Sequence, residues 1–473
     1  MTDEAVSIAT ASAELAPRLD GELITPGDSG YDAAREVWNG MVDKRPGAVV
    51  RARSEDDVAA TVRFAAENEL LLAVRGGGHS VAGQGTCDGG LVLDLGGIDH
   101  VVVDTEANIT RAGGGCLLRN VDRANQAQGR VTPAGVVSHT GAGGLTLGGG
   151  VGWLTRSFGL TCDNVAFFRL VTAAGEKLVA SEDENPDLYW ALRGGGGNFG
   201  VVTEFGYRCH PFPTEIPVAV TYWTLADAPA VLRRHSELMP ERPREWKATV
   251  FVSRPSAARG VPAEMVGKPC MSMVQVWAGS ELADAEAQLA PLHEVATPAY
   301  EEFGFMPYMQ LQTIEDENAG RGKNNYTKGG YLDDDFGDGA IEALLASAEE
   351  ILNEESIVEV IPHGGAQLDL GDADAAFPDR ASLYSFNVYA RWPLEEANDA
   401  HIAWVRRAFD RLDAHAGDGV YVNFFNPDEG GDQSRVLSAF GRERYDKLAG
   451  LKHRYDPTNL FSLNPNIFPA EAA

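Results

Sequence analysis

The stretch Val74–Gly83, "VRGGGHSVAG", places three consecutive glycines and one histidine between two apolar runs. Residues 71–74 lead into it and residues 90–95 follow it, so the pattern predicts a strand, a tight loop and a second strand. Glycines in such a loop allow positive φ and bring backbone N–H groups close to a ligand. From these residues alone, four roles stay open for His79: metal ligand, base, covalent attachment point or turn residue.

Two further glycine clusters, at 141–152 and 194–200, follow in the same half of the chain. Three such loops in one predicted domain indicate a long, close approach of backbone to a ligand. Their N–H groups suit a pyrophosphate, which an acidic protein can then bind with few cations. Arg75 and Arg193 add positive charge beside two of the loops. We therefore predict a dinucleotide ligand.

Short sequence motifs argue against several classes of enzyme and binding site. The segment 195–200, "GGGNFG", fits GxGxxG, but a strand-like run follows it and no acidic ribose partner stands where a Rossmann fold needs one. The sequence contains no GxxxxGK[ST], HExxH or GxSxG, so P-loop, zincin and α/β-hydrolase functions lack support. Its five cysteines are widely spaced without a CxxC, so we expect neither a disulfide framework nor a metal site.

The charge is strongly acidic. The 473 residues have a net charge of −30, and only 8 of the 39 basic residues are lysines. This balance argues against nucleic acid as a partner and suggests a high-salt environment, in which salt screens the self-repulsion. No apolar run approaches the about 20 residues of a membrane span. The N-terminal residues lack the order of a secretory signal, which favours a cytoplasmic protein.

The organisation changes twice along the chain. Residues 25–213 alternate short strands with glycine clusters and one helix, which Ser54 caps at its start. Residues 214–414 carry long helical patterns such as 282–296 and 338–355, and strands such as 384–392. Glycine and strand patterns return at 417–427, "GDGVYVNFFNP". We therefore expect a first domain at 25–213 that is completed by residues 415–473, and a second, α+β domain at 214–414.

Several ordered motifs resemble one family. They are the glycine loop at 74–83, "GVVSHTGAGGLTLGGGVGWLTRSFGLTCDNV" (135–165), "LYWALRGGGGNFGVVTEF" (188–205), "YVNFFNP" (421–427) and "YDKLAGLKHRYDPTNLFSLNPNI" (445–467). Together they resemble the berberine-bridge-enzyme-like FAD-linked oxidases of the vanillyl-alcohol oxidase superfamily. The resemblance implies an α+β fold: a two-part FAD-binding domain of the PCMH type, and a substrate domain with an antiparallel sheet covered by helices.

The resemblance also implies the cofactor and its site. His79 would bond covalently to the 8α-methyl group of FAD. Some relatives add a cysteinyl bond, but Val137 occupies that position here, so we expect no second bond. The expected cofactor-binding residues are Arg75, Gly76, Gly77, Gly78, His79, Ser80, Gly83, Gly135, Val137, Gly141, Gly143, Gly144, Thr146, Gly148, Gly149, Gly152, Trp153, Asp163, Asn164, Gly200, Val202, Asn464 and Asn466.

The implied reaction is hydride transfer from a small substrate to the flavin, with O2 as the acceptor and peroxide as the product. Two residue pairs are candidates to assist it: Tyr421 with Asn423, and Gln367 with Asp369, each expected to share one face of a strand. His139 is either near the flavin ring or stabilises its loop. Amines, alcohols and carbohydrates stay open as substrates, as do a non-oxygen acceptor and a monomeric or homodimeric state.

Overall fold

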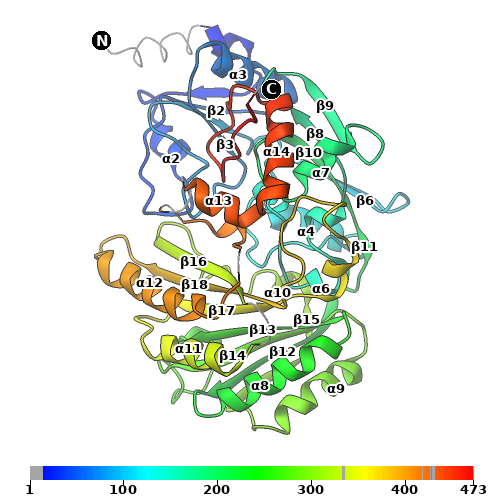
Figure 1. Ribbon diagram of the computed structural model, residues 1–473, viewed down its shortest axis with the longest axis vertical. Coiled ribbons are helices and arrows are strands. Elements are labelled where there is room, and N and C mark those ends of the chain that lie inside the picture. The colour runs from blue at the N-terminus through cyan, green and yellow to red at the C-terminus, as the bar shows by residue number, and fades with distance from the viewer. Residues whose placement is uncertain (1–13, 333–335, 418, 427, 429–431, 472–473) are drawn as a thin grey trace.

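The computed structural model describes residues 14–332, 336–417, 419–426, 428 and 432–471 (Figure 1). Residues 418 and 427, in the segment expected to hold a returning strand, lie outside these ranges. No helix in the described ranges combines the length and the apolar character that crossing a membrane requires.

The first glycine loop lies in a small mixed sheet, as the sequence predicts. Strand β3 (Leu72–Arg75) leads into the loop, and β4 (Leu91–Asp94) follows it and pairs with β3 in parallel. The sheet order is β1-β2-β4-β3, with β1 (Glu22–Ile24) and β2 (Ala48–Arg51) at the other edge.

Helix α3 (Glu55–Glu67) begins where the sequence predicts. The Ser54 hydroxyl accepts a hydrogen bond from the Asp57 backbone N–H at 3.1 Å, and the Asp57 carboxylate accepts one from the Ser54 N–H at 3.2 Å. This reciprocal pair satisfies N–H groups that the first helical turn leaves without partners. The apolar side of α3 packs on the first sheet, where Val58 and Val62 are buried.

A five-stranded antiparallel sheet completes this half, in the order β5-β6-β10-β8-β9. Its strands are β5 (Val101–Asp104), β6 (Ile109–Gly113), β8 (Val165–Val171), β9 (Lys177–Ser181) and β10 (Val201–Arg208). Two short strands, β7 (Arg130–Val131) and β11 (His210–Pro211), pair beside it. The accompanying helices are α2 (Tyr31–Arg35), α4 (Leu118–Gln126), α5 (Ala142–Leu147), α6 (Thr155–Phe158) and α7 (Pro186–Leu192).

The middle of the chain forms a seven-stranded antiparallel sheet, in the order β15-β12-β14-β13-β17-β18-β16. Its strands are β12 (Glu215–Thr224), β13 (Trp246–Ser253), β14 (Cys270–Trp277), β15 (Tyr300–Pro307), β16 (Asn324–Leu332), β17 (Ile357–Pro362) and β18 (Tyr384–Trp392). The short helix α10 (Tyr308–Leu311) follows β15. This sheet forms the lower half of the molecule in Figure 1.

One face of that sheet is covered by four helices: α8 (Ala228–Leu238), α9 (Leu282–His293), α11 (Asp338–Glu349) and α12 (Asp399–Asp413) (Figure 1). Because side chains alternate along a strand, the even-numbered residues of β13 and β18, such as Val250 and Val388, pack under these helices. The odd-numbered residues face the glycine-rich half. The α+β fold with a helix-covered antiparallel sheet is therefore as the sequence predicts.

The C-terminal helices α13 (Gln433–Phe440) and α14 (Arg442–Tyr455) return to the glycine-rich half, where α14 packs against α7 (Figure 1). Lys452 of α14 is fully buried and pairs with Asp456 at 2.7 Å. Its ammonium also donates to the backbone oxygens of Asn198 and Phe461, both at 2.9 Å. This contact ties the third glycine cluster to the C-terminal segment. It supports the division into 25–213, 214–414 and 415–473, which remains our proposal.

Candidate functional site

A cavity of about 350 Å³ lies between the glycine loops and the seven-stranded sheet. One wall is made of backbone from all three glycine clusters. The opposite wall is made of side chains from β13, β17 and β18, and residues 421–425 and 461–465 close the remaining sides. Of the residues expected from sequence, those that line it are Arg75, Gly76, Gly77, Gly78, His79, Ser80, Gly135, Val137, Gly141, Gly143, Gly144, Gly152, Gly200, Val202, Tyr421, Asn423 and Asn464.

Two of the glycine loops touch each other. A Cβ on Gly77 would lie 2.4 Å from the backbone N of Gly141, and a Cβ on Gly141 would lie 2.3 Å from the backbone N of Gly77. Gly78 adopts a φ of 66°, which favours glycine. The loops pack at backbone contact because neither residue has a side chain.

Other glycines leave room for a ligand instead. A Cβ on Gly144 or Gly197 would meet no protein atom within 4 Å, and both residues line the cavity. A backbone wall with this open space suits a large, flat, phosphate-bearing group such as FAD.

The two arginines beside the loops do not supply free charge. Arg75 is buried and pairs with Asp94 at 2.8 Å, and it also donates to the carbonyl of Ala34. The guanidinium of Arg193 donates to the carbonyl of Asp374 and stacks 4.2 Å from the ring of Tyr189. Both guanidinium groups are therefore bonded to acceptors of the protein itself, and the loops present mainly amide groups to the cavity.

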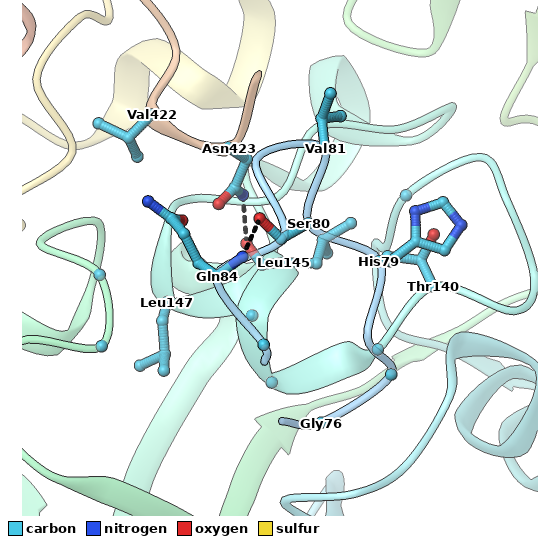
Figure 2. A pocket seen from close by; sticks show the side chains of 18 of the residues that line it. Gly76, His79, Ser80, Val81, Gln84, Thr140, Leu145, Leu147, Val422 and Asn423 are labelled. Atoms are coloured by element: carbon cyan, nitrogen blue, oxygen red, sulfur yellow. Dashed lines mark hydrogen bonds between the residues drawn. The ribbon is translucent and has the colours of Figure 1, made fainter. Parts of the chain in front are cut away.

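His79 lies on the cavity wall (Figure 2). Its ring stacks on Trp38 at 4.2 Å, and its Nε2 lies 3.1 Å from Nδ1 of His139. Burial holds the pKa of His79 well below its ordinary value, and the nearby His139, Arg321 and Arg391 add to this effect. The imidazole is therefore neutral near pH 7 and keeps the nitrogen lone pair that a bond to carbon or a metal requires.

Tyr421 and Asn423 meet, although not on a strand as expected. Residues Val422–Phe424 form a 3₁₀ turn, and Asn423 Nδ2 donates to Tyr421 Oη at 2.8 Å. It also donates to the carbonyl of Leu145 at 3.1 Å (Figure 2). Tyr421 Oη also accepts the N–H of Gly150 at 2.8 Å. Burial raises the pKa of Tyr421, so the phenol keeps its proton. The pair anchors the residue 421–425 segment to the second glycine cluster.

The expected strand with Gln367 and Asp369 is wrong. Gly364 and Gly365 take φ values of 93° and 59°, which turn the chain into a 3₁₀ helix at Gly365–Asp369. Gln367 is buried against His363, whose Nδ1 lies 3.1 Å from its Oε1, and Asp369 pairs with Arg244 on the surface at 2.8 Å. Neither residue lines the cavity, so we do not retain them as catalytic candidates.

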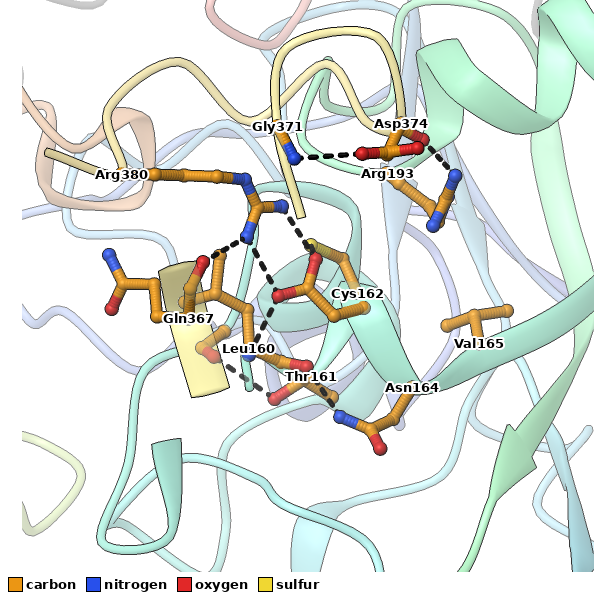
Figure 3. Close-up of polar contacts among 12 residues, drawn as sticks. Leu160, Thr161, Cys162, Asn164, Val165, Arg193, Gln367, Gly371, Asp374 and Arg380 are labelled. Carbon is orange, nitrogen blue, oxygen red and sulfur yellow. Dashed lines mark hydrogen bonds and ion pairs between the residues drawn. The ribbon is translucent and has the colours of Figure 1, made fainter. Parts of the chain in front are cut away.

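Asp163 and Asn164 have structural partners outside the cavity. Asp163 forms a buried ion pair with Arg380 at 2.6 Å and accepts the N–H of Leu160 (Figure 3). Asn164 Nδ2 donates to the carbonyl of Phe158, and its Oδ1 lies 2.7 Å from Nε2 of His210.

The remaining expected residues that do not line the cavity serve packing. Trp153 is buried in the apolar layer between the glycine-rich half and the seven-stranded sheet, and Thr146 Oγ1 lies 2.8 Å from Tyr207 Oη. A Cβ on Gly148 would collide with Asn423, and one on Gly149 with Phe377. Two more belong to this group: Gly83, where a Cβ would collide with Val42, and Asn466, whose carbonyl accepts from Gln433.

Four ionisable side chains of the sheet line the cavity and were missed from sequence: Lys247, Glu359, Tyr389 and Arg391. Lys247 Nζ donates to the carbonyl of Gly152 at 2.6 Å, and burial lowers its pKa to about 7. Glu359 accepts from Tyr389 Oη at 3.2 Å, and burial raises its pKa to about 7. A carboxyl group with this pKa can accept a proton near neutral pH.

Two family models match the chain. A model described as an FAD binding domain matches residues 46–181, and one described as berberine and berberine like matches residues 420–468. The chain is 29% identical to (R)-6-hydroxynicotine oxidase from Paenarthrobacter nicotinovorans over 95% of this chain and 97% of that protein. It is 26% identical to an FAD-linked oxidoreductase from Dictyostelium discoideum over 97% of each.

Comparison with solved structures also finds similar oxidases. The crystal structure of 6-hydroxy-D-nicotine oxidase from Arthrobacter nicotinovorans superposes with a TM-score of 0.84 at 27% identity, over 96% of this chain and 98% of that one. The xylooligosaccharide oxidase from Myceliophthora thermophila superposes with a TM-score of 0.85 over 100% of both chains. At 20% identity, the latter similarity shows the fold alone.

Proposed function

This chain belongs to the berberine-bridge-enzyme-like FAD-linked oxidoreductases, and on that premise we propose that it oxidises a C–OH or C–N bond of a small organic substrate. We propose further that His79 holds the FAD through an 8α-histidyl bond. The observation that supports both is the position of the His79 imidazole on the wall of a backbone-lined cavity that faces ionisable side chains.

Bound FAD would accept a hydride from the substrate carbon, and would pass its two electrons and that proton to O2, which leaves as hydrogen peroxide after taking up the second proton that the substrate OH or NH releases. A side chain of the protein takes up the proton that leaves the substrate OH or NH group. Glu359 stands on the sheet wall with a pKa of about 7 and accepts the proton of the substrate OH or NH. Tyr389 orients that carboxylate through its 3.2 Å hydrogen bond. Tyr421 and Asn423 hold the adjoining wall in place.

We propose that His79 makes the only covalent bond to the flavin. Val137 lines the cavity at the position where some relatives have a bonding cysteine, and a valine side chain cannot form a thioether. The five cysteines are all buried, and none of them is among the described residues that line the cavity.

The test is to purify the protein in salt, precipitate it with acid and measure flavin in the washed pellet, alongside His79→Ala. Flavin retained in the wild-type pellet and released from the variant supports a single histidyl bond. Flavin in the wild-type supernatant refutes that bond, and protein purified without flavin refutes the oxidoreductase proposal. Peroxide release with alcohols, amines and carbohydrates then tests the acceptor, because flavin that a substrate bleaches without peroxide in air indicates an acceptor other than O2.

A further inference from the structure

Arg391 is a buried cation that forms no ion pair with any residue in the described part of the chain. The residue is 7% exposed and lines the cavity from β18. Among the described residues, no carboxylate lies within ion-pair distance of its guanidinium, and its buried Nε has no hydrogen-bond partner. A lone charge taken out of water is costly unless an opposite charge compensates it. The other buried arginines that flank the glycine loops have such partners or accepting carbonyls, as described above for Arg75 and Arg193.

Arg391 lies near the end of the cavity that contains His79. Arg391 lies on β18, opposite Asn325 of the neighbouring strand β16. The backbone of Asn325 is hydrogen-bonded to the side chain of Asn39. Asn39 follows Trp38, the residue that stacks on His79. Arg391 is also close enough to His79 to help lower the imidazole pKa. The guanidinium therefore stands on the sheet wall, across from the loop that would hold the flavin.

Neighbouring groups only partly compensate the charge. The Tyr389 ring lies 5.2 Å from the guanidinium, a cation–π contact that is weaker than an ion pair. Glu359, the acidic residue of the same wall, is hydrogen-bonded to Tyr389 and Asn387 rather than to Arg391. Lys247 is a second basic side chain on this wall, and its amino group donates to the carbonyl of Gly152.

We propose that Arg391 binds a carboxylate of the substrate, so that the enzyme oxidises a small organic acid. The planar guanidinium matches a carboxylate bidentately, and the pair would be shielded from salt inside the cavity. The oxidisable carbon then lies between this anchor and Glu359, which takes the substrate proton. The inference rests on the proposed function for the reaction, but binding of a carboxylate can be measured without turnover.

The probes are benzoate and benzamide, which have nearly the same shape and differ in charge. Isothermal titration calorimetry of the purified holoprotein measures both dissociation constants, and flavin is quantified in the same samples. We expect benzoate to bind at least about 10-fold more tightly than benzamide. Arg391→Gln should abolish this preference with flavin content unchanged, and Arg391→Lys should retain part of it. Arg244→Gln, a surface arginine that pairs with Asp369, is the matched control and should leave both constants unchanged.

Three results would overturn the inference: equal affinity for the two probes in the wild type, no benzoate binding at millimolar concentration, or an unchanged preference in Arg391→Gln. Loss of flavin from Arg391→Gln and Arg391→Lys would assign the guanidinium to the cofactor instead, which also overturns it. A wild-type protein that contains flavin yet shows no benzoate preference refutes only the carboxylate site. Protein without flavin refutes the proposed function, while calorimetry still decides the carboxylate.

Discussion

Gly77→Ala and Gly144→Ala insert the same methyl group at two walls of one cavity and should have opposite effects. At Gly77 the new Cβ would lie 2.4 Å from a backbone nitrogen of the neighbouring loop. At Gly144, a residue of helix α5 that lines the cavity, it would meet no protein atom within 4 Å. The first change should therefore destabilise the protein, and the second should exclude FAD.

The magnitudes follow from these contacts. A methyl group in ordinary contact needs about 1 Å more room than Gly77 offers, and overpacking of this kind costs about 1–3 kcal/mol. For a unit of 150–250 residues this lowers the unfolding midpoint by about 2–12 °C. Gly144 is helical, so alanine there should stabilise the flavin-free protein by up to about 1 kcal/mol.

Both variants are best compared in the His79→Ala background, from which flavin can be removed. Thermal unfolding of the flavin-free proteins gives the stability change, and titration with FAD gives the affinity. We expect Gly77→Ala to unfold earlier and Gly144→Ala to unfold no earlier than its parent but to lose FAD binding. Undiminished FAD affinity in Gly144→Ala, or an unchanged midpoint in Gly77→Ala, would refute the assignment of these two walls.

Three further predictions follow from the charged groups. Lys452→Met leaves the buried Asp456 carboxylate without its partner and should cost about 3–5 kcal/mol in denaturant unfolding, whereas Arg442→Met, which breaks an exposed pair, should cost at most about 1 kcal/mol; equal costs would contradict the role of burial. Because Glu359 must be ionised to accept a proton, the rate of anaerobic flavin reduction by substrate should increase as the pH rises through about 7. This increase of the rate with pH should be absent in Glu359→Gln. Raising KCl to about 2 M should raise the unfolding midpoint, since salt screens the net charge of −30, and a flat response would remove the high-salt hypothesis.

Sequence reasoning succeeded where the structure is local. Glycine runs, the Ser54 cap and helical periodicity each depend on residues that are neighbours in the chain, and the observed β3, α3 and α11 agree with them. The Gln367 strand failed because two glycines at positive φ turn the chain, which apolar alternation does not reveal.

The sequence did not reveal the cavity wall that the seven-stranded sheet forms, because three strands that lie far apart in sequence assemble this wall. Lys247, Glu359 and Arg391 become neighbours only through the order β13-β17-β18. A signal was present in "YSFNVYARW", where polar residues alternate with apolar ones on a strand. Alternation of this kind normally marks a solvent-facing side, and only tertiary structure shows that this polar side is buried against the glycine loops.

The Lys452 contact has a consequence for biosynthesis. Asn464 and Pro465 line the cavity, and the buried ammonium fixes the segment before them by its bonds to Asp456 and Phe461. These residues leave the ribosome after every other part of the cavity wall. A nascent chain therefore has an incomplete cavity wall until translation has delivered this last segment. Cofactor loading in this protein should consequently follow synthesis rather than accompany it.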